Sequence, residues 1–286
     1  MSWQGWAAIA FWIAATMLNC HIANRWYRSR WARPFVATLF GVTLLVLWEG
    51  LVRGLNVSPV ILPAPTVIAA RFAQSLPLLW GDFTQTILKG ALSGYLIGCG
   101  VAVLVAILVD RSPFLRRGLL PVGNFIAALP IVGIAPILVM WFGFDWQSKA
   151  AVVVVMVFFP VLINMVAGLA ATDPLQRDLM RTYSATGRQN LLYLRLPAAM
   201  PFLFNGLKIA TTLALIGAIV AEFFGSPTRG MGFRISTAVG QLDLPLVWAE
   251  IAVAALAGSG FFGLMTLIEK AVTFWHPSQR AAGRGA

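Results

Sequence analysis

Charged residues are scarce in this chain of 286 residues: Asp, Glu, Lys and Arg account for 11% of it, and hydrophobic residues for 59%. Because a soluble domain has roughly 25% charged residues, this chain has too little charge to cover a water-exposed surface. A lipid bilayer is therefore the expected solvent. The length allows one membrane domain and leaves no room for a large soluble enzyme as well.

Residues that carry metal, redox or hydrolytic chemistry are also few. The two cysteines, Cys20 and Cys99, lie inside apolar stretches and have neither metal-binding nor redox spacing. The chain has only two histidines, His21 and His276, and the zinc-protease pattern H-E-x-x-H is missing. We therefore expect no metal site, no bound cofactor and no catalytic residue.

A nucleotide-binding loop is missing as well. A Walker A loop, G-x-x-x-x-G-K-[ST], cradles phosphates with its backbone N–H groups, and none of the four lysines is followed by Ser or Thr. This chain cannot bind ATP in that way. Any ATP that drives its function has to be used by a partner chain.

Long apolar stretches dominate what is present. A helix needs about 20 apolar residues to cross the hydrocarbon layer, and seven stretches meet this requirement: 4–22, 34–54, 84–109, 119–142, 149–171, 199–224 and 247–270. The fourth contains Pro121, Pro130 and Pro136, so we expect it to be bent or broken. The predicted fold class is an all-α integral membrane protein with about seven transmembrane helices.

The net charge of +11 indicates an orientation rather than a nucleic-acid partner, because no soluble basic domain is present to bind one. Basic residues gather in the cytoplasmic loops of membrane proteins. If the loop 23–33 is cytoplasmic, the segments on that side hold 14 Lys and Arg residues and those on the other side hold 5. This predicts a multi-pass protein of the inner (plasma) membrane with its N-terminus outside and its C-terminus in the cytoplasm.

The first apolar stretch is preceded by Met1 to Gln4, which contain no Lys or Arg, whereas arginines follow it. A signal peptide has the opposite arrangement, so we expect an uncleaved transmembrane helix, with an interfacial helix as the alternative. Two of the outside segments, 55–83 and 225–246, are long enough to contain short helices. In the first of them, Thr66 after Pro65 marks a helix start.

Glycines recur with helical spacing in the third apolar stretch. Gly90, Gly94 and Gly98 are four residues apart, which places them on one face of a helix. A stripe of small residues lets a neighbouring helix approach closely. We interpret this stripe as a packing surface rather than a binding site.

Polar residues inside the predicted spans have two interpretations. Asn124, Asn164 and Asn205 either form hydrogen bonds between helices or line a water-filled path for a polar solute. Lys208 lies about three turns inside its span. It either extends its side chain to the membrane surface or faces a polar path.

The segment 172–198 is too long for a simple connector and too apolar to be only solvated. Thr172-Asp173-Pro174 ends the preceding span, and residues 178–186 can form a short helix that Gly187 breaks. Such a helix exposes Leu179, Met180 and Tyr183. An exposed apolar surface of this kind predicts a partner protein that covers it.

Several motifs occur together in a recognisable order. They are, along the chain, Leu62-Pro63-Ala64-Pro65; Leu129-Pro130 through Ala135-Pro136 to Trp141-Phe142-Gly143; Phe158-Phe159-Pro160 with Asn164 and then Asp173-Pro174; Leu196-Pro197-Ala198-Ala199-Met200-Pro201; and Ala221-Glu222-Phe223 followed by Gly230-Met231-Gly232. With this order and spacing, the chain resembles the permease subunit of binding-protein-dependent ABC importers, in the nitrate/sulfonate/taurine-type branch. The resemblance covers about residues 60–275.

That family has a cytoplasmic motif, Glu-Ala-Ala-x3-Gly-x9-Ile-x-Leu-Pro, on a coupling helix that docks on the ATPase subunit. Aligning the motif on Leu196-Pro197 puts Asp178 at its Glu position, Leu179-Met180 at its Ala pair, Ser184 at its glycine and Leu194 at its isoleucine, with Gly187 three residues later. The ATPase-coupling residues that this implies are Asp178, Arg181, Thr182, Tyr183, Ser184, Ala185, Gly187 and Arg188. The implied residues of the translocation path or gate are Asn124, Pro130, Asn164, Asn205 and Glu222.

The resemblance implies import of a small polar solute that an external binding protein delivers. The solute class stays open between sulfonates, taurine or nitrate and a vitamin or pyrimidine precursor, and the ending Phe274-Trp275-His276-Pro277 favours the latter slightly. The implied partners are an ATP-binding subunit, a solute-binding protein, a second permease copy forming a homodimer, and membrane lipid.

The implied domain organisation is a six-helix importer core with one extra helix. Residues 1–33 form the extra N-terminal transmembrane helix and a basic cytoplasmic loop, 34–275 form the transmembrane domain with the coupling loop 172–198, and 276–286 form a cytoplasmic tail. The alternative functions are an ion-gradient-driven secondary transporter and a non-transporting membrane scaffold. Acids at mid-membrane and inverted repeats are typical of the former, and neither is visible in the sequence.

Overall fold

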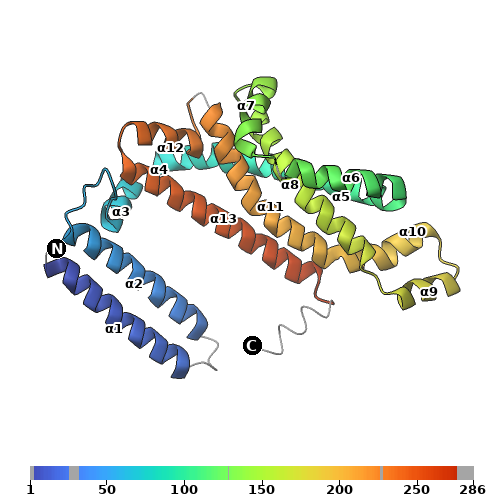
Figure 1. Cartoon of the computed structure of the whole chain (residues 1–286), viewed down its shortest axis with the longest axis horizontal. Coiled ribbons are helices and arrows are strands. Elements are labelled where there is room, and N and C mark those ends of the chain that lie inside the picture. The colour runs from blue at the N-terminus through green and yellow to red at the C-terminus, as the bar shows by residue number, and fades with distance from the viewer. Residues whose placement is uncertain (1–2, 26–31, 128, 226–227, 276–286) are drawn as a thin grey trace. The chain divides into compact units, whose positions relative to one another are not determined.

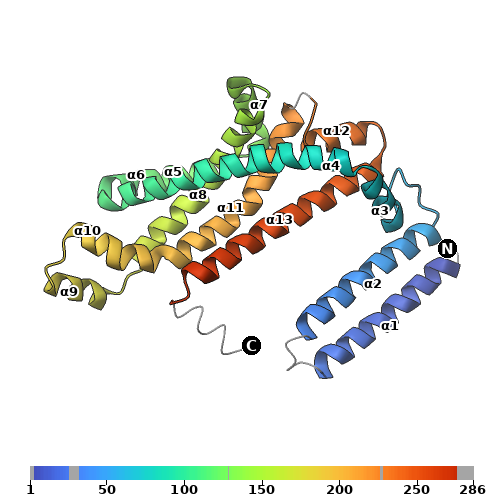
Figure 2. The ribbon, with the colours of Figure 1, turned by 180° about the vertical axis from the view of Figure 1, so that it is seen from behind.

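All regular elements are helical in the part of the chain that the computed structural model describes, which comprises residues 3–25, 32–127, 129–225 and 228–275 (Figures 1 and 2). The α-helices are α1 (Trp3–Arg25), α2 (Ala32–Gly54), α3 (Pro65–Gln74), α4 (Leu76–Phe83), α5 (Leu92–Arg111), α6 (Pro113–Ala127), α7 (Ile131–Phe142), α8 (Trp146–Ala170), α9 (Pro174–Thr182), α10 (Gly187–Asn190), α11 (Leu196–Phe224), α12 (Met231–Gly240) and α13 (Leu244–Val272). Two π-helices, η1 (Thr84–Ala91) and η2 (Leu191–Arg195), interrupt them. The predicted tail 276–286 lies outside the described residues.

Six helical segments in the described ranges are long and apolar enough to cross a membrane: Gly5–Asn24, Pro34–Gly54, Leu76–Arg111, Trp146–Ala170, Gly187–Phe224 and Leu244–Val272. They overlap six of the seven predicted stretches. The remaining stretch, 119–142, does not form one long helix, because α6 ends at Ala127 and α7 begins at Ile131. Pro130 precedes α7 with an extended backbone (φ −68°, ψ 114°) and has no N–H with which to continue a helix. The predicted break is confirmed.

The chain divides into two units, which are described separately. The first comprises residues 1–79 and 235–252. In it, Glu49 of α2 accepts hydrogen bonds from the backbone N–H and the hydroxyl of Thr66, at 3.0 and 2.7 Å. Arg53 donates to the same carboxylate at 2.5 Å. The carboxylate therefore satisfies an N–H in the first turn of α3. This helix begins at Pro65, one residue before the predicted start.

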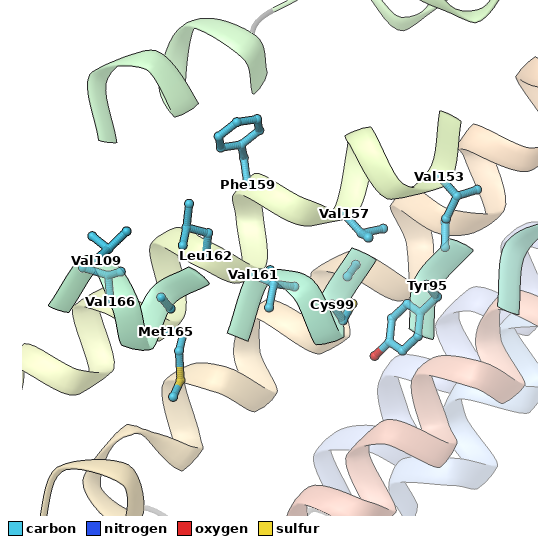
Figure 3. Close-up of a cluster of buried hydrophobic side chains, with 14 of the residues drawn as sticks. Tyr95, Cys99, Val109, Val153, Val157, Phe159, Val161, Leu162, Met165 and Val166 are labelled. Carbon is cyan, nitrogen blue, oxygen red and sulfur yellow. The ribbon is translucent and has the colours of Figure 1, made fainter. Parts of the chain in front are cut away.

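The second unit comprises residues 80–234 and 253–285, and its core lies between α5, α8 and α11. Figure 3 shows Tyr95 and Cys99 of α5 beside Val153 and Val157 of α8. A methyl group added at Gly94 would lie 2.5 Å from Val153 Cβ, and one added at Gly98 would lie 2.5 Å from Val157 Cγ2. These distances leave no room for a side chain, so the predicted glycine stripe is confirmed as the packing surface of α5 against α8.

Candidate functional site

The helix α9 begins earlier than predicted. Asp173 is its N-cap, and its carboxylate accepts a hydrogen bond from the N–H of Leu175 at 2.9 Å. Pro174 occupies the first helical position, where its missing N–H costs nothing. The preceding span does end just before this segment, since α8 stops at Ala170, and Asp173 also starts the next helix, which was predicted to begin at 178.

The end of α9 explains why the aligned motif has a glycine at the position of Ser184. Ser184 has φ +50°, which is the left-handed conformation that glycine favours. The N–H of Ser184 donates to the carbonyl of Arg181 at 2.9 Å. The N–H of Ala185 donates to the carbonyl of Met180 at 3.0 Å. This is the Schellman arrangement that closes a helix. The alignment therefore places glycine where the backbone requires a residue that tolerates φ > 0.

Gly187 does not break a helix, and that prediction was wrong. It begins α10, because Thr186 accepts from the N–H of Gln189 while the Gln189 side chain accepts from the N–H of Thr186. This reciprocal capping box is a helix start. The sequence Thr-x-x-Gln could have indicated it.

Three large hydrophobic side chains are exposed on the otherwise polar surface of this segment. Leu175, Leu179 and Tyr183 are 77%, 56% and 76% exposed. The predicted coupling residues Asp178, Arg181, Thr182, Tyr183, Ser184, Gly187 and Arg188 are all exposed, and Ala185 is half-buried. The structure thus brings the predicted coupling residues together on one short, exposed stretch between α8 and α11.

A buried ion pair joins the end of this segment to the helix bundle. Arg195, the last residue of η2, forms a bidentate pair with Asp110 of α5, with both N–O distances at 2.6 Å. The same guanidinium donates to the carbonyl of Leu169 at the end of α8, at 3.1 and 3.0 Å. Arg195 therefore ties the beginning of α11 to the ends of α5 and α8. Neither Arg195 nor Asp110 was among the predicted site residues.

At the other end of α8 and α11, Glu222 lies in a buried polar cluster. The Thr86 hydroxyl is 2.9 Å from both of its carboxylate oxygens and accepts from the N–H of Met231 at 2.8 Å. The N–H of Gly232 donates to Glu222 at 2.8 Å. Thr86 and Glu222 are less than 2% exposed. We call Asp82, Thr86, Lys149, Glu222 and residues 230–234, which lie at the start of α12, the Glu222 cluster.

Two more charged residues of the cluster bind backbone groups on either side of it. Asp82 accepts from the N–H of Gly230 at 2.7 Å and from Arg234 at 2.8 Å. Lys149 is 1% exposed and donates to the carbonyls of Phe144 and Gly225. Neither Lys149 nor Asp82 was among the predicted site residues. The only sequence feature that could have identified Asp82 and Lys149 is that each is a charged residue among apolar neighbours.

Glycine is required at two positions of this cluster, one directly before α12 and one in its first turn. Gly230 has φ +130°, and a Cβ there would collide with the Glu222 carboxylate. A Cβ at Gly232 would meet the carbonyl oxygen of Ile219 and would lie 2.9 Å from Glu222 Cβ. The motif Gly230-Met231-Gly232 is thus explained by the close approach of the start of α12 to α11.

The polar residues of the spans pair with one another. Asn205 donates to the side chain of Asn164 at 3.0 Å, and Asn205 is exposed on this single chain. Lys208 forms an ion pair with Glu269 of α13 at 2.9 Å, so its ammonium group has a partner inside the protein. The side chain of Asn124 lies outside the described residues, although its backbone belongs to α6.

The predicted coupling residues and the Glu222 cluster therefore lie at opposite ends of the same helices. Figures 1 and 2 show α9 and α10 at one end of α8 and α7 at the other. The 25 residues of α8 span about 37 Å at 1.5 Å per residue, which exceeds the hydrocarbon thickness of about 30 Å. Asn164 and Asn205 lie between these ends. The geometry defines a polytopic helical membrane protein with an exposed segment on one side and a buried polar cluster near the other.

Comparison with known proteins identifies the class more closely. Residues 94–274 match the family "Binding-protein-dependent transport system inner membrane component". The chain is 33% identical to the formylaminopyrimidine transport permease protein of Halalkalibacterium halodurans over 85% of its length and 96% of that protein. It is 34% identical to the riboflavin transport system permease protein of Chloroflexus aurantiacus over 82% and 88%. It is 27% identical to the taurine transport system permease protein of Escherichia coli over 88% and 93%.

The chain belongs to the family of binding-protein-dependent transport system inner membrane components. It is the permease subunit of an ABC importer, a multi-pass inner-membrane protein that is not itself the ATPase. Systems of this family also contain an ATPase and a binding protein. The predicted function is thus confirmed, and neither the ion-driven carrier nor the scaffold describes the chain.

Proposed function

We propose that this permease imports its solute by coupling the α9–α10 segment, residues 174–190, to an ATPase subunit in the cytoplasm. The observation that carries the proposal is the exposure of Leu175, Leu179 and Tyr183 on this segment. Apolar side chains that face water at the end of a membrane bundle favour a protein partner. The coupling residues are Asp178, Arg181, Thr182, Tyr183, Ser184, Ala185, Gly187 and Arg188.

The proposed topology has the N-terminus outside and the C-terminus in the cytoplasm, and it rests on the excess of basic residues in the segments assigned to the inside. In it, α1 crosses the membrane as an extra helix before the importer core of 34–275, and 276–286 form a cytoplasmic tail. The helices α6 and α7 cross together as a broken seventh span. Backbone groups freed at such a break are tolerated where protein covers them.

Two copies of the chain form the proposed translocation path. Asn205 is exposed on the single chain and polar at membrane depth, a combination that favours a second protein surface or a water-filled path opposite it. Asn164, Asn124 and Pro130 belong to this path. Glu222 is part of a gate near the outer end of this path. On that side of the membrane, the solute-binding protein docks on the segments 55–83 and 225–246.

A heterocyclic solute is the proposed cargo. The relatives named for formylaminopyrimidine and riboflavin are 33% and 34% identical to this chain, whereas those named for aliphatic sulfonates and taurine are 29% and 27% identical. Labelled pyrimidine or flavin precursors should therefore be taken up, and unlabelled taurine should not compete with them. Taurine uptake without heterocycle uptake would reverse this assignment.

Co-purification with the ATPase subunit tests the coupling surface. Tyr183→Ala should reduce the amount of ATPase that co-purifies and should reduce uptake. Tyr193→Ala is the matched control, because Tyr193 on η2 is 75% exposed but lies outside the proposed surface, compared with 76% for Tyr183. Equal ATPase recovery from the two variants contradicts the proposed docking surface.

Cysteine labelling tests the topology. A Cys20→Ser background retains only the buried Cys99, and Thr182→Cys then places one exposed thiol on α9. A membrane-impermeant maleimide should label this thiol in inside-out vesicles and not in intact cells. Labelling from outside intact cells would place α9 beyond the reach of any ATPase.

A further inference from the structure

A groove lies between the last turn of α5 and the elbow formed by α10 and η2. Its volume is about 680 Å³, and its lining includes Arg111 from α5 and Arg188, Asn190 and Leu192 from the elbow. All of these residues belong to the second unit of the chain. The groove adjoins the Arg195–Asp110 pair but is not filled by it.

The charges that line the groove do not cancel. Arg195 neutralises Asp110, because the two form a bidentate ion pair at 2.6 Å. Arg111 and Arg188 are exposed, and neither has an acidic partner among the residues that the structure describes. The groove therefore presents two uncompensated guanidinium groups, which are well suited to phosphate oxygens.

A third group favours an occupant with a hydrogen-bond donor. The Oδ1 atom of Asn190 is buried and has no hydrogen-bond partner in the structure. A buried acceptor without a partner is costly. A hydroxyl group on a ligand in the groove would satisfy it.

The depth of the groove indicates where such a ligand would come from. Arg111 is the last residue of the apolar segment Leu76–Arg111, so the groove lies at one end of a candidate membrane span. Leu192 is 45% exposed and Leu191 also lines the groove. Apolar and basic side chains thus face the same space, as expected where an acyl chain meets a charged headgroup.

We propose that this groove binds the phosphate of an anionic phospholipid with a hydroxylated headgroup, such as phosphatidylglycerol. Arg111 and Arg188 contact the phosphate, Asn190 accepts from the headgroup hydroxyl, and the exposed Leu192 contacts the upper acyl chain. The assignment of the site to the inner leaflet rests on the proposed function, whereas the lipid chemistry rests only on the groove. Arg188 also belongs to the proposed coupling surface, so the test is built on Arg111.

The test measures retention of lipid by the purified full-length chain in detergent. Labelled phosphatidylglycerol or phosphatidylcholine is titrated onto wild type, Arg111→Gln and Arg117→Gln. Arg117 is the matched control, because it is an exposed arginine on α6 that does not line the groove. Wild type should prefer phosphatidylglycerol, and Arg111→Gln should weaken that binding about fivefold, since one basic residue at an anionic surface contributes about 1 kcal/mol. Arg117→Gln should leave it unchanged.

Other occupants give different results. Equal weakening by both substitutions means diffuse surface charge and overturns the site. Displacement of the lipid by inorganic phosphate at equal concentration assigns the groove to free phosphate instead of a lipid. If Arg111→Gln leaves lipid retention unchanged but lowers recovery of the ATPase subunit, the groove belongs to the partner interface and the proposal fails. Loss of α9 labelling in inside-out vesicles with lipid retention intact refutes only the proposed topology.

Discussion

The ion pair between Arg195 and Asp110 gives a quantitative test of how the α9–α10 segment is held. Asp110→Ala removes the acceptor of two charge-assisted hydrogen bonds of 2.6 Å. The Asp110 and Arg195 side chains are 6% and 24% exposed, so water screens the pair only in part. Breaking a buried pair costs about 3–5 kcal/mol. Because Arg195 retains the Leu169 carbonyl and some contact with water, we expect a loss of about 2–3 kcal/mol.

Thermal unfolding of the purified chain measures this loss. Each kcal/mol shifts Tm by about 2–4 °C for a protein of roughly this size, so Asp110→Ala and Arg195→Ala should each lower Tm by about 4–12 °C. The double variant should unfold close to the less stable single variant, because both substitutions remove the same interaction.

An exposed ion pair in the same region provides the control. Asp178 and Arg181 are 3.1 Å apart, and their side chains are 65% and 82% exposed. Since exposed pairs contribute little to stability, Asp178→Ala should leave Tm unchanged. If losses at Asp110 and Arg195 add in the double variant, or if Asp178→Ala lowers Tm as much, the ion pair does not anchor the segment.

Three further substitutions test packing, the Glu222 cluster and the end of α9. Gly98→Ala places a methyl group 2.5 Å from Val157 Cγ2, so overpacking should cost about 1–3 kcal/mol of stability and lower Tm. Gly100→Ala, which has no atom within 4 Å of the added methyl group, should not lower Tm. Equal effects of the two substitutions would contradict the α5–α8 interface. Thr86→Val leaves the N–H of Met231 without a partner and leaves the Glu222 carboxylate with the N–H of Gly232 but without the Thr86 hydroxyl. Limited proteolysis between α11 and α12 should therefore become faster. Thr84→Val, which loses only a 2.8 Å bond to the Gly81 carbonyl, should not change it. Ser184→Gly should raise Tm by relieving about 1 kcal/mol of left-handed strain, and Ser184→Val should lower it; the opposite order would disprove the Schellman closure.

Hydrophobicity predicted most of the fold because the bilayer imposes length and composition on every span. The segments around 34–54 and 149–171 were placed within a few residues. Pro130 predicted the break between α6 and α7, since its effect is local. The start of α9 and the role of Gly187 were missed, because Asp173 and Thr186 act as caps whose side chains turn back onto the chain.

The site could be predicted only where its chemistry is local in sequence. The exposed apolar residues of α9 form such a pattern. Asp110 and Arg195 are 85 residues apart, and Lys208 and Glu269 are 61 apart, so no pattern in a single sequence pairs them. The π-helix η1, which carries Thr86, also has no sequence pattern that we recognised. Such turns are stabilised by tertiary contacts and occur often at functional sites.

The length of α8 has a mechanical consequence. This helix acts as a lever whose two arms end at the segment α9–α10 and at Lys149. A tilt of about 5° about its middle displaces each end by about 1.6 Å in opposite directions, given a rod of about 37 Å. Displacements of one to two ångströms are enough to switch packed helical interfaces between alternative arrangements. A small push at one membrane surface would therefore reach the hydrogen bonds of Lys149 at the other without any bending of the helix itself.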